Sequence, residues 1–365
     1  MKTNRSQTRS LWAPAVKAVA LAAAVGASSA ALAAENGLQR YSPGVGGSDM
    51  TAPLVPGWYG QMPLVVYHAS KIKDNSGDAK VQSGSTTVTG LGTIPYSAKL
   101  DYSADTVALQ PRLTYLSANQ LWGANLGMTV MLPLVYRKLD LSASSVTLGT
   151  TVPEPYATAI KSGVASNIAG LSGSVFGLGD LEFSPIMHWE IGDHQHVTFA
   201  PTIIIPTGEY DKYRRVNPGY GNFFTFRPSV QYAFIGDGWD VGARLVWSYN
   251  TRNKDTGYRS GTIMNIDYQA MAFVSDDVRV GLQGYVVQQL SRDSQDLSGF
   301  SASDVAKLSQ DTSTGNKMHA YAAGPAVAWL KNGGEFLLEG KFLQEFGARN
   351  RAEGQAFWLM FSKPL

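Results

Sequence analysis

Along most of the chain, apolar and polar residues alternate one by one. The segment 223–235, with the sequence FFTFRPSVQYAFI, places aromatic and aliphatic side chains on one parity and Thr, Arg, Ser, Gln and Ala on the other. A period of two is that of a β-strand, whose successive side chains point to opposite faces. No helical periodicity of comparable length competes with this pattern, so we predict an all-β protein.

The connections between the alternating segments come in two kinds. We predict about twelve strands, a number typical of bacterial barrels, near 57–72, 104–116, 121–137, 176–191, 196–208, 223–235, 239–251, 261–275, 278–291, 317–330, 335–347 and 354–365. The connections at 117–120, 192–195, 236–238, 276–277 and 331–334 are tight. Long, polar connections alternate with them at 73–103, 138–175, 209–222, 252–260, 292–316 and 348–353.

This alternation of short and long connections is typical of outer-membrane β-barrels, which have short periplasmic turns and long outer loops. We therefore predict a transmembrane, antiparallel, up-and-down β-barrel over residues 57–365. The last strand must pair with the first, because hydrocarbon offers no partner to an open sheet edge. A soluble β-sandwich also alternates, but its strands are usually ~5–6 residues long, shorter than these.

The charged residues decide which parity faces lipid. Arg112, Arg227 and Arg244 lie inside predicted strands, opposite in parity to the aromatic residues. An arginine facing lipid near the bilayer midplane costs roughly 2–4 kcal/mol, so the polar parity must line the lumen. The predicted lining is Gln110, Arg112, Glu182, His188, Arg227, Gln231, Arg244, Asp267, Gln269, Gln283, Glu339 and Lys341. These side chains either pair with one another or form a constriction that orients a solute.

Five prolines occur on the lipid-facing parity, at similar distances from the tight turns: Pro111, Pro185, Pro201, Pro228 and Pro325. Proline cannot donate a hydrogen bond to the ladder of a sheet and is normally confined to edges or bulges. We hypothesise that these prolines form a belt of bulges or kinks in the barrel wall.

The first thirty-odd residues have the features of an export signal. Lys2, Arg5 and Arg9 precede an apolar stretch, and Ala31-Leu32-Ala33 forms a small-x-small cleavage site. We predict a signal peptide over 1–33, a mature chain that begins near Ala34, and export to the bacterial outer membrane. Without the four basic residues of 1–33, 26 basic and 28 acidic residues remain, so composition gives no support to nucleic-acid binding.

Between the signal peptide and the barrel, residues 34–56 are rich in Gly, Pro and Ser and are predicted to be irregular. This segment is a candidate plug that folds into the lumen from the periplasmic side. At the other end, Phe357, Leu359 and Phe361 lead to Leu365, which is typical of chains inserted by the barrel-assembly machinery, although Lys363 and Pro364 interrupt the rhythm. With no cysteine in the chain, thiol chemistry is excluded.

Few residues suggest catalytic or metal chemistry. His194 and His196, with Asp193, form too small a ligand set for a metal site, and a solvated turn is the better interpretation. Residues 177–180, of sequence GLGD, enter a strand and lack the helix N-terminus of a phosphate loop. An outer-membrane lipid-modifying enzyme would need a serine beside His68 or His319, and no serine is singled out. We predict no enzyme activity, cofactor or metal.

Four short motifs resemble the outer-membrane family named for the meta-pathway of phenol degradation. They are Tyr41-Ser42-Pro43-Gly44, Pro56-Gly57-Trp58-Tyr59 with Tyr67 and Ala69 following, Gly177-Leu178-Gly179-Asp180-Leu181, and Pro206-Thr207-Gly208-Glu209-Tyr210. The resemblance implies a barrel channel that admits aromatic or other hydrophobic molecules. It supplies no defined binding residues.

The expected function is passive or facilitated uptake of small, hydrophobic or aromatic molecules across the outer membrane. The alternative is a structural or surface-recognition barrel whose lumen is plugged, with 138–175 or 34–56 as the plug. The expected partners are outer-membrane lipid and a small solute. The oligomeric state is left open.

Overall fold

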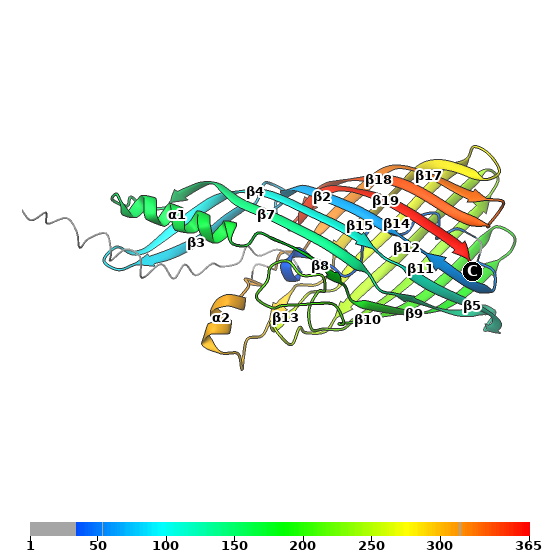
Figure 1. Ribbon diagram of the computed structural model, residues 1–365, viewed down its shortest axis with the longest axis horizontal. Coiled ribbons are helices and arrows are strands. Elements are labelled where there is room, and N and C mark those ends of the chain that lie inside the picture. Colours follow the sequence, from blue (N-terminus) through cyan, green and yellow to red (C-terminus); the bar gives the residue numbers. More distant parts are fainter. Residues whose placement is uncertain (1–33, 53, 314) are drawn as a thin grey trace, which may run out of the picture.

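The structure is a computed structural model that describes residues 34–52, 54–313 and 315–365; the predicted signal peptide at 1–33 lies outside them. It shows one closed antiparallel barrel of twelve wall strands (Figure 1). The barrel closes where β19 (Ala352–Pro364) pairs with β1 (Gly57–Gln61) and β2 (Leu64–Ile72). The predicted fold class is confirmed.

Eight wall strands run without a break. They are β10 (Gln195–Ile205), β11 (Thr225–Gly236), β12 (Trp239–Asn250), β14 (Ile263–Phe273), β15 (Val278–Gln289), β17 (His319–Lys331), β18 (Phe336–Arg349) and β19. Tight turns join them at one end, and these turns include Asp237-Gly238 and Asn332-Gly333, whose φ angles are all positive. Asp-Gly and Asn-Gly pairs favour this backbone conformation, which matches the twist of a hairpin.

The other four wall strands are each split in two. The pairs are β1 with β2, β4 (Gly92–Leu109) with β5 (Arg112–Leu121), β6 (Ala124–Met131) with β7 (Leu134–Leu148), and β8 (Gly173–Leu178) with β9 (Leu181–Ile191). The breaks lie side by side: Gln110 N donates to Pro63 O at 2.8 Å, and Gly179 N donates to Pro133 O at 2.8 Å. Proline, which lacks an N–H, explains why the ladder stops at three of these four positions.

The structure agrees only in part with the hypothesis that five prolines form a belt of bulges or kinks. Pro111 lies in one of the strand breaks, whereas Pro185, Pro201, Pro228 and Pro325 lie inside continuous strands. Beside these four, however, the paired register with one neighbouring strand is interrupted. The row of breaks also includes Pro63 and Pro133, which the hypothesis did not include.

Two of the predicted loops extend the wall sheet beyond the barrel. In 73–103 and 138–175 the wall sheet continues outward as β3 (Val81–Val88) and the outer halves of β4 and β7, and α1 (Tyr156–Ala169) covers it (Figure 1). Val164 and Ile168 of α1 are buried against Tyr96 and Ala98 of β4. This helix depends on that tertiary contact, which local periodicity does not reveal.

One predicted turn is wrong. The turn expected at 117–120 lies instead at Trp122-Gly123, between β5 and β6, with φ angles of 53° and 76°. A register shift between Leu116 and Gln120 shows why: the Ser-Ala-Asn stretch there forms an irregularity within the strand instead of its end.

The remaining elements lie at the outer end of the barrel. They are the 3-10 turn at Glu35–Gly37, the small strand pair β13 (Tyr258–Arg259) and β16 (Ser294–Gln295), and α2 (Ala302–Leu308). In the part of the chain that the structure describes, no helix has the length and apolar character needed to cross a membrane.

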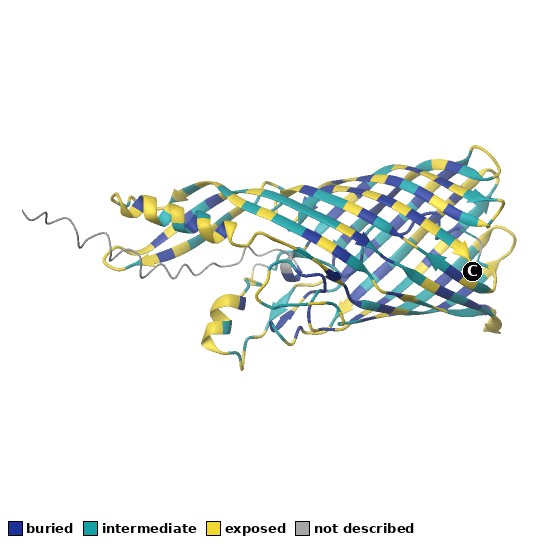
Figure 2. Ribbon diagram, in the orientation of Figure 1, coloured by how far each residue is buried: buried dark blue, intermediate teal, exposed yellow. Residues whose placement is uncertain are grey.

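The exposed fractions follow the predicted parity. On β11, Phe226 and Tyr232 are 48% and 43% exposed, whereas Arg227 and Gln231 are 8% and 6% exposed. Figure 2 shows this alternation as a chequered pattern over the barrel wall. The outer surface is thus an apolar belt, and the polar side chains point inward.

We predict that Leu282→Arg destabilises the barrel by roughly 2–4 kcal/mol, because Leu282 lies on the outer face of β15, 60% exposed, well inside the apolar belt. Leu290→Arg, just beyond β15, should cost only about 0–1 kcal/mol, as at a membrane interface. Urea unfolding in lipid vesicles, followed by tryptophan fluorescence, measures both. Equal losses in the two variants would contradict a lipid-facing belt.

Candidate channel lumen and outer vestibule

The segment 34–56 lies inside the barrel. At the outer end, the Glu35 carboxylate accepts hydrogen bonds from Thr256 (2.6 Å) and Asn253 (3.0 Å) in the loop between β12 and β14. At the turn end, Val55 N bonds to the Tyr59 hydroxyl at the start of β1 (2.9 Å). The segment therefore spans the lumen from the long loops to the short turns.

Near the outer end, Arg40 anchors the segment to two glycine-rich stretches of the wall. Its guanidinium pairs with Asp180 at 2.9 Å and stacks on Phe223, 3.8 Å from the ring centroid. Asp180 also accepts the Gly208 N–H at 3.0 Å. A Cβ on Gly208 would lie 2.8 Å from the backbone of Gly179, so the two stretches can meet only through glycine.

In the middle of the lumen, Asp267 of β14 holds the segment through one carboxylate. It accepts hydrogen bonds from the Tyr41 hydroxyl (2.6 Å), Gly44 N (2.9 Å) and Gly46 N (2.8 Å). A Cβ on Gly46 would lie 2.9 Å from an Asp267 oxygen. The glycines of the segment therefore let its backbone approach the wall closely enough for these bonds.

A second carboxylate, that of Glu339 on β18, binds the next turn of the segment. It accepts Ser48 N at 2.7 Å and pairs with Lys341 at 3.2 Å. The Lys341 ammonium in turn donates to Gly46 O at 2.7 Å. A Cβ on Gly47 would lie 2.2 Å from a Glu339 oxygen, so this position too requires glycine.

The lower part of the segment meets arginine and amide side chains. Asp49 lies between Arg112 (3.8 Å) and Arg244 (3.5 Å). The carbonyl of Met50 accepts a hydrogen bond from Gln231 at 2.7 Å, and Gln231 itself accepts two from Arg244. Charge pairing here links the segment to the lumen wall.

The other predicted lining residues are also in the lumen. Their partners are Ser42 for Gln110, Arg227 for Glu182, Thr198 for His188, Thr51 for Gln269, and Glu339 for Gln283. Apart from His188, the twelve side chains thus pair with one another or with residues 40–51.

Several residues of the lumen were missed or misread from sequence. His196 was taken for a residue of a solvated turn, but its ring bonds to Met50 O at 3.0 Å inside the barrel. Arg279 and Asp240 form an ion pair at 2.7 Å in which both side chains are fully buried. Arg279 shares the parity of Gln283 on β15, so the alternation could have revealed it. Asp49 has no comparable signal, because 34–56 has no period.

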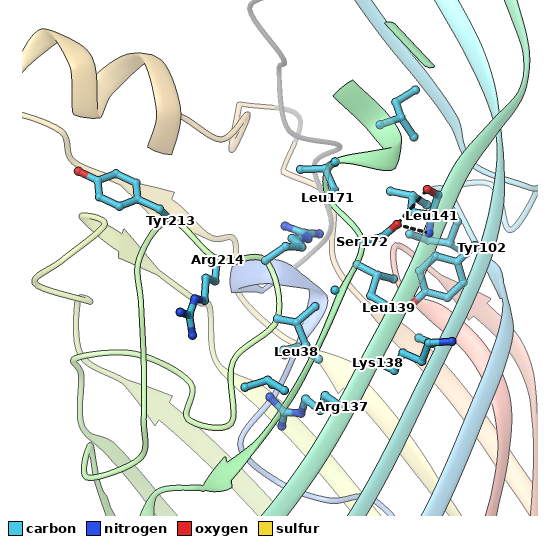
Figure 3. Close-up of a pocket in the computed structure, with 18 of the residues that line it drawn as sticks. Leu38, Tyr102, Arg137, Lys138, Leu139, Leu141, Leu171, Ser172, Tyr213 and Arg214 are labelled. Carbon is cyan, nitrogen blue, oxygen red and sulfur yellow. Dashed lines mark hydrogen bonds between the residues drawn. The ribbon is translucent and has the colours of Figure 1, made fainter. Parts of the chain in front are cut away.

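Above the segment, the outer end of the barrel holds a cavity of about 710 Å³, which we call the outer vestibule. Its walls come from β4, β7, the end of α1 and the loop between β10 and β11, and its floor includes Glu35 and Leu38 of the segment. Figure 3 shows Leu38, Leu139 and Leu171 lining the cavity, with Tyr102 on β4. About half of the lining residues are aliphatic or aromatic, and most of the others have polar side chains, lysine and arginine among them.

Two charged side chains at the vestibule, those of Arg137 and Glu35, contact neighbouring residues through hydrogen bonds or ring stacking. Arg137 donates to Asn217 O at 2.9 Å and stacks on Tyr220, 4.5 Å from the ring centroid. Burial raises the pKa of Glu35, while hydrogen bonds from Thr256 and Asn253 act in the opposite direction. Burial also lowers the pKa of Arg215. The vestibule is thus poorly solvated at its floor.

Beside the segment a smaller cavity of about 160 Å³, the lower cavity, remains in the lumen, lined by Tyr41, Asp49, Arg112 and Glu182 among others. Glu35 and Leu38 of the segment line the outer vestibule, and its residues from Tyr41 to Leu54 contribute to the lining of the lower cavity. The short stretch between Leu38 and Tyr41 therefore separates the part of the segment at the vestibule from the part along the lower cavity. Within the described residues no group of three or more His, Asp or Glu side chains could hold a metal ion.

A closed antiparallel barrel with an apolar outer wall and a polar lumen is the architecture of bacterial outer-membrane β-barrels, and in this chain the N-terminal segment occupies the lumen. The chain belongs to the family described as a putative MetA-pathway of phenol degradation, whose model matches residues 70–361. The two motifs at 177–181 and 206–210 lie inside that match, whereas those at 41–44 and 56–59 precede it.

Among solved structures, an outer membrane channel from Pseudomonas putida F1 shares the fold, with a TM-score of 0.59 and 13% identity, over 86% of this chain and 98% of that one. Two further structures are more distant. The transport unit of the Escherichia coli autotransporter AIDA-I has a TM-score of 0.40 and 6% identity, over 85% of this chain and 90% of that one. The CymD monoaromatic hydrocarbon channel has a TM-score of 0.38 and 10% identity, over 92% of this chain and 98% of that one. No curated protein sequence matches the chain.

We predict that Asp267→Asn lowers the free energy of unfolding by about 1–3 kcal/mol, because three donors of the segment lose a charged acceptor and the new amide N–H₂ faces them. Asp237→Asn is the matched control. It lies in an exposed turn at a φ of 53°, which asparagine tolerates. Guanidinium titration of the purified protein measures both; equal stability of the two variants would contradict the anchoring role of Asp267.

Proposed function

We propose that this chain is a channel of the bacterial outer membrane for small hydrophobic or aromatic molecules. The observation that carries the proposal is the outer vestibule, a cavity of about 710 Å³ at the mouth of the barrel whose lining combines leucine, isoleucine, valine and tyrosine side chains with polar and charged ones. Ligand sites of this kind are concave, mostly apolar and have a few polar groups. Membership of a family described by phenol degradation is consistent with an aromatic solute.

The vestibule offers such a solute a place to leave water before it enters the lumen. Tyr102 and Tyr210 present ring faces, on which an aromatic molecule can stack, and Leu139 and Leu171 add aliphatic surface. Arg214, whose side chain is 67% exposed, supplies a cation to which a hydroxyl or a carboxylate of the solute can bind.

Residues 34–56 form the constriction in this proposal. They occupy the lumen between the vestibule and the turn end of the barrel, so in this proposal a solute passes only when part of the segment shifts. The lower cavity of about 160 Å³ has room for about one aromatic ring, but the segment fills the lumen beside it. We therefore propose movement of the segment instead of a permanently open pore. The polar lining contributes by holding the segment in place.

The second candidate is a structural barrel, and the same filled lumen favours it. The two candidates differ in what removal of the segment does. α1 packs on the outward extension of β4 and β7, so the loop at 138–175 covers that extension, and only 34–56 is left as a candidate plug in the described structure.

A binding measurement tests the vestibule. Leu171→Asp places a carboxylate in the apolar wall at a position already 38% exposed, so folding is preserved. We expect binding of 1-naphthol, a small aromatic probe, to weaken about tenfold, equal to about 1.4 kcal/mol, in equilibrium dialysis. Leu91→Asp, at the 39% exposed tip of the β3–β4 hairpin, should bind like the unmodified protein. An unchanged affinity in Leu171→Asp would place the binding site elsewhere.

Planar-bilayer recordings test the constriction. We expect a variant lacking residues 38–52 to conduct several times more current than the full chain, because these residues occupy the lumen and their removal leaves space for water and ions. A variant with residues 150–171 removed, which deletes α1, should conduct like the full chain. If both deletions leave conductance and 1-naphthol uptake into vesicles unchanged, the structural-barrel candidate is favoured.

A further inference from the structure

The backbone nitrogen of Ala34 lies at a site built to receive a charge. It is 2.7 Å from Oδ2 of Asp293, in the loop between β15 and β17. Ala34 is fully buried. The same carboxylate accepts hydrogen bonds from the Tyr258 hydroxyl, Gly261 N and the Gln289 amide, each at 2.7 Å. Asp293 is thus fully coordinated, with one of its four donors taken from the N-terminal segment.

Within an intact precursor, all four donors to Asp293 are neutral. Asp293 is half-buried, and a carboxylate partly withdrawn from water gains from a cationic partner. The Glu35 carboxylate, next along the chain from Ala34, is buried and adds to the negative charge at this end of the segment. The other titratable groups close to Glu35 are Arg40, Tyr210, Tyr258 and Arg215, and the two arginines offset part of its charge.

The backbone of Ala34 points to the same conclusion. Its φ is 60° and its ψ is 158°, a region that is essentially restricted to glycine. In a peptide-bonded alanine this conformation is strained, because the Cβ meets the neighbouring backbone. An N-terminal residue has no preceding carbonyl and therefore no such constraint.

We propose that cleavage of the Ala33–Ala34 bond creates an α-ammonium at Ala34 that forms an ion pair with Asp293 and locks residues 34–56 in the lumen. Water attacks the Ala33 carbonyl, the C–N bond breaks, the hydroxyl stays on Ala33 as part of its new carboxyl group, and the released amine takes up protons. The protease class is that of signal peptidases, which cut after the small-x-small sequence at 31–33.

Two independent features therefore meet at one bond. The sequence pattern places the cleavage after Ala33, and the fold places a coordinated carboxylate on the nitrogen that this cleavage releases. Ion pairs with hydrogen-bonded partners gain strength where water is excluded. Removal of residues 1–33 thus completes the anchor of the segment, whatever solute the channel carries.

The test is the reactivity of the α-amine in the purified mature protein in detergent. An amine-directed acylating reagent at neutral pH is followed by mass spectrometry of the N-terminal peptide. With the anchor intact the amine should react slowly, and Asp293→Asn should raise the rate at least about tenfold, as expected for loss of a charge-assisted contact. Asp311→Asn is the control, because Asp311 lies in the same loop and its carboxylate accepts hydrogen bonds from Ser313.

An insertion variant separates the ion pair from a general loosening of the loop. One serine placed between Ala33 and Ala34 moves the ammonium away while Asp293 keeps its bonds to Tyr258 and Gly261. We expect it to react as fast as Asp293→Asn, with no further increase when the two changes are combined. A multiplicative increase, equal rates in Asp293→Asn and the unmodified protein, or a mature chain that starts elsewhere than Ala34 would each overturn the proposal.

Discussion

The structure depends on one constraint: a sheet that faces hydrocarbon must satisfy every backbone hydrogen bond within itself. Pairing of β19 with β1 and β2 meets this requirement and closes the wall. Closure has a second consequence. It creates a lumen whose polar side chains are cut off from bulk water at its centre and need partners of their own.

Residues 34–56 supply many of those partners. The buried carboxylates of Asp267 and Glu339 accept hydrogen bonds from the backbone N–H groups of Gly44, Gly46 and Ser48. Without the segment, these carboxylates would lack those donors. The wall and the segment therefore stabilise each other. The described residues between Leu38 and Pro56 contain no helix or strand, so the wall sets the conformation of the segment.

The two family motifs of the wall acquire a physical meaning from this arrangement. Residues 177–180 and 206–208 meet through Gly179 and Gly208, and Asp180 between them binds Arg40 of the segment. These stretches therefore hold the N-terminal segment at the floor of the outer vestibule. They position the constriction and do not themselves line the proposed solute site, apart from the neighbouring Tyr210.

The sequence by itself determined the barrel, its strand number and the side of each strand that faces lipid, because a period of two and the cost of a lipid-facing arginine act locally along each strand. The inward position of Arg227 and Gln231 follows from that alternation alone. Only the tertiary structure decided what those side chains bind, since 34–56 has no period and its glycines gain meaning only beside Asp267 and Glu339. The vestibule, too, needed contacts between α1, β4, β7 and Leu38, which lie far apart along the chain and meet only after the barrel has closed.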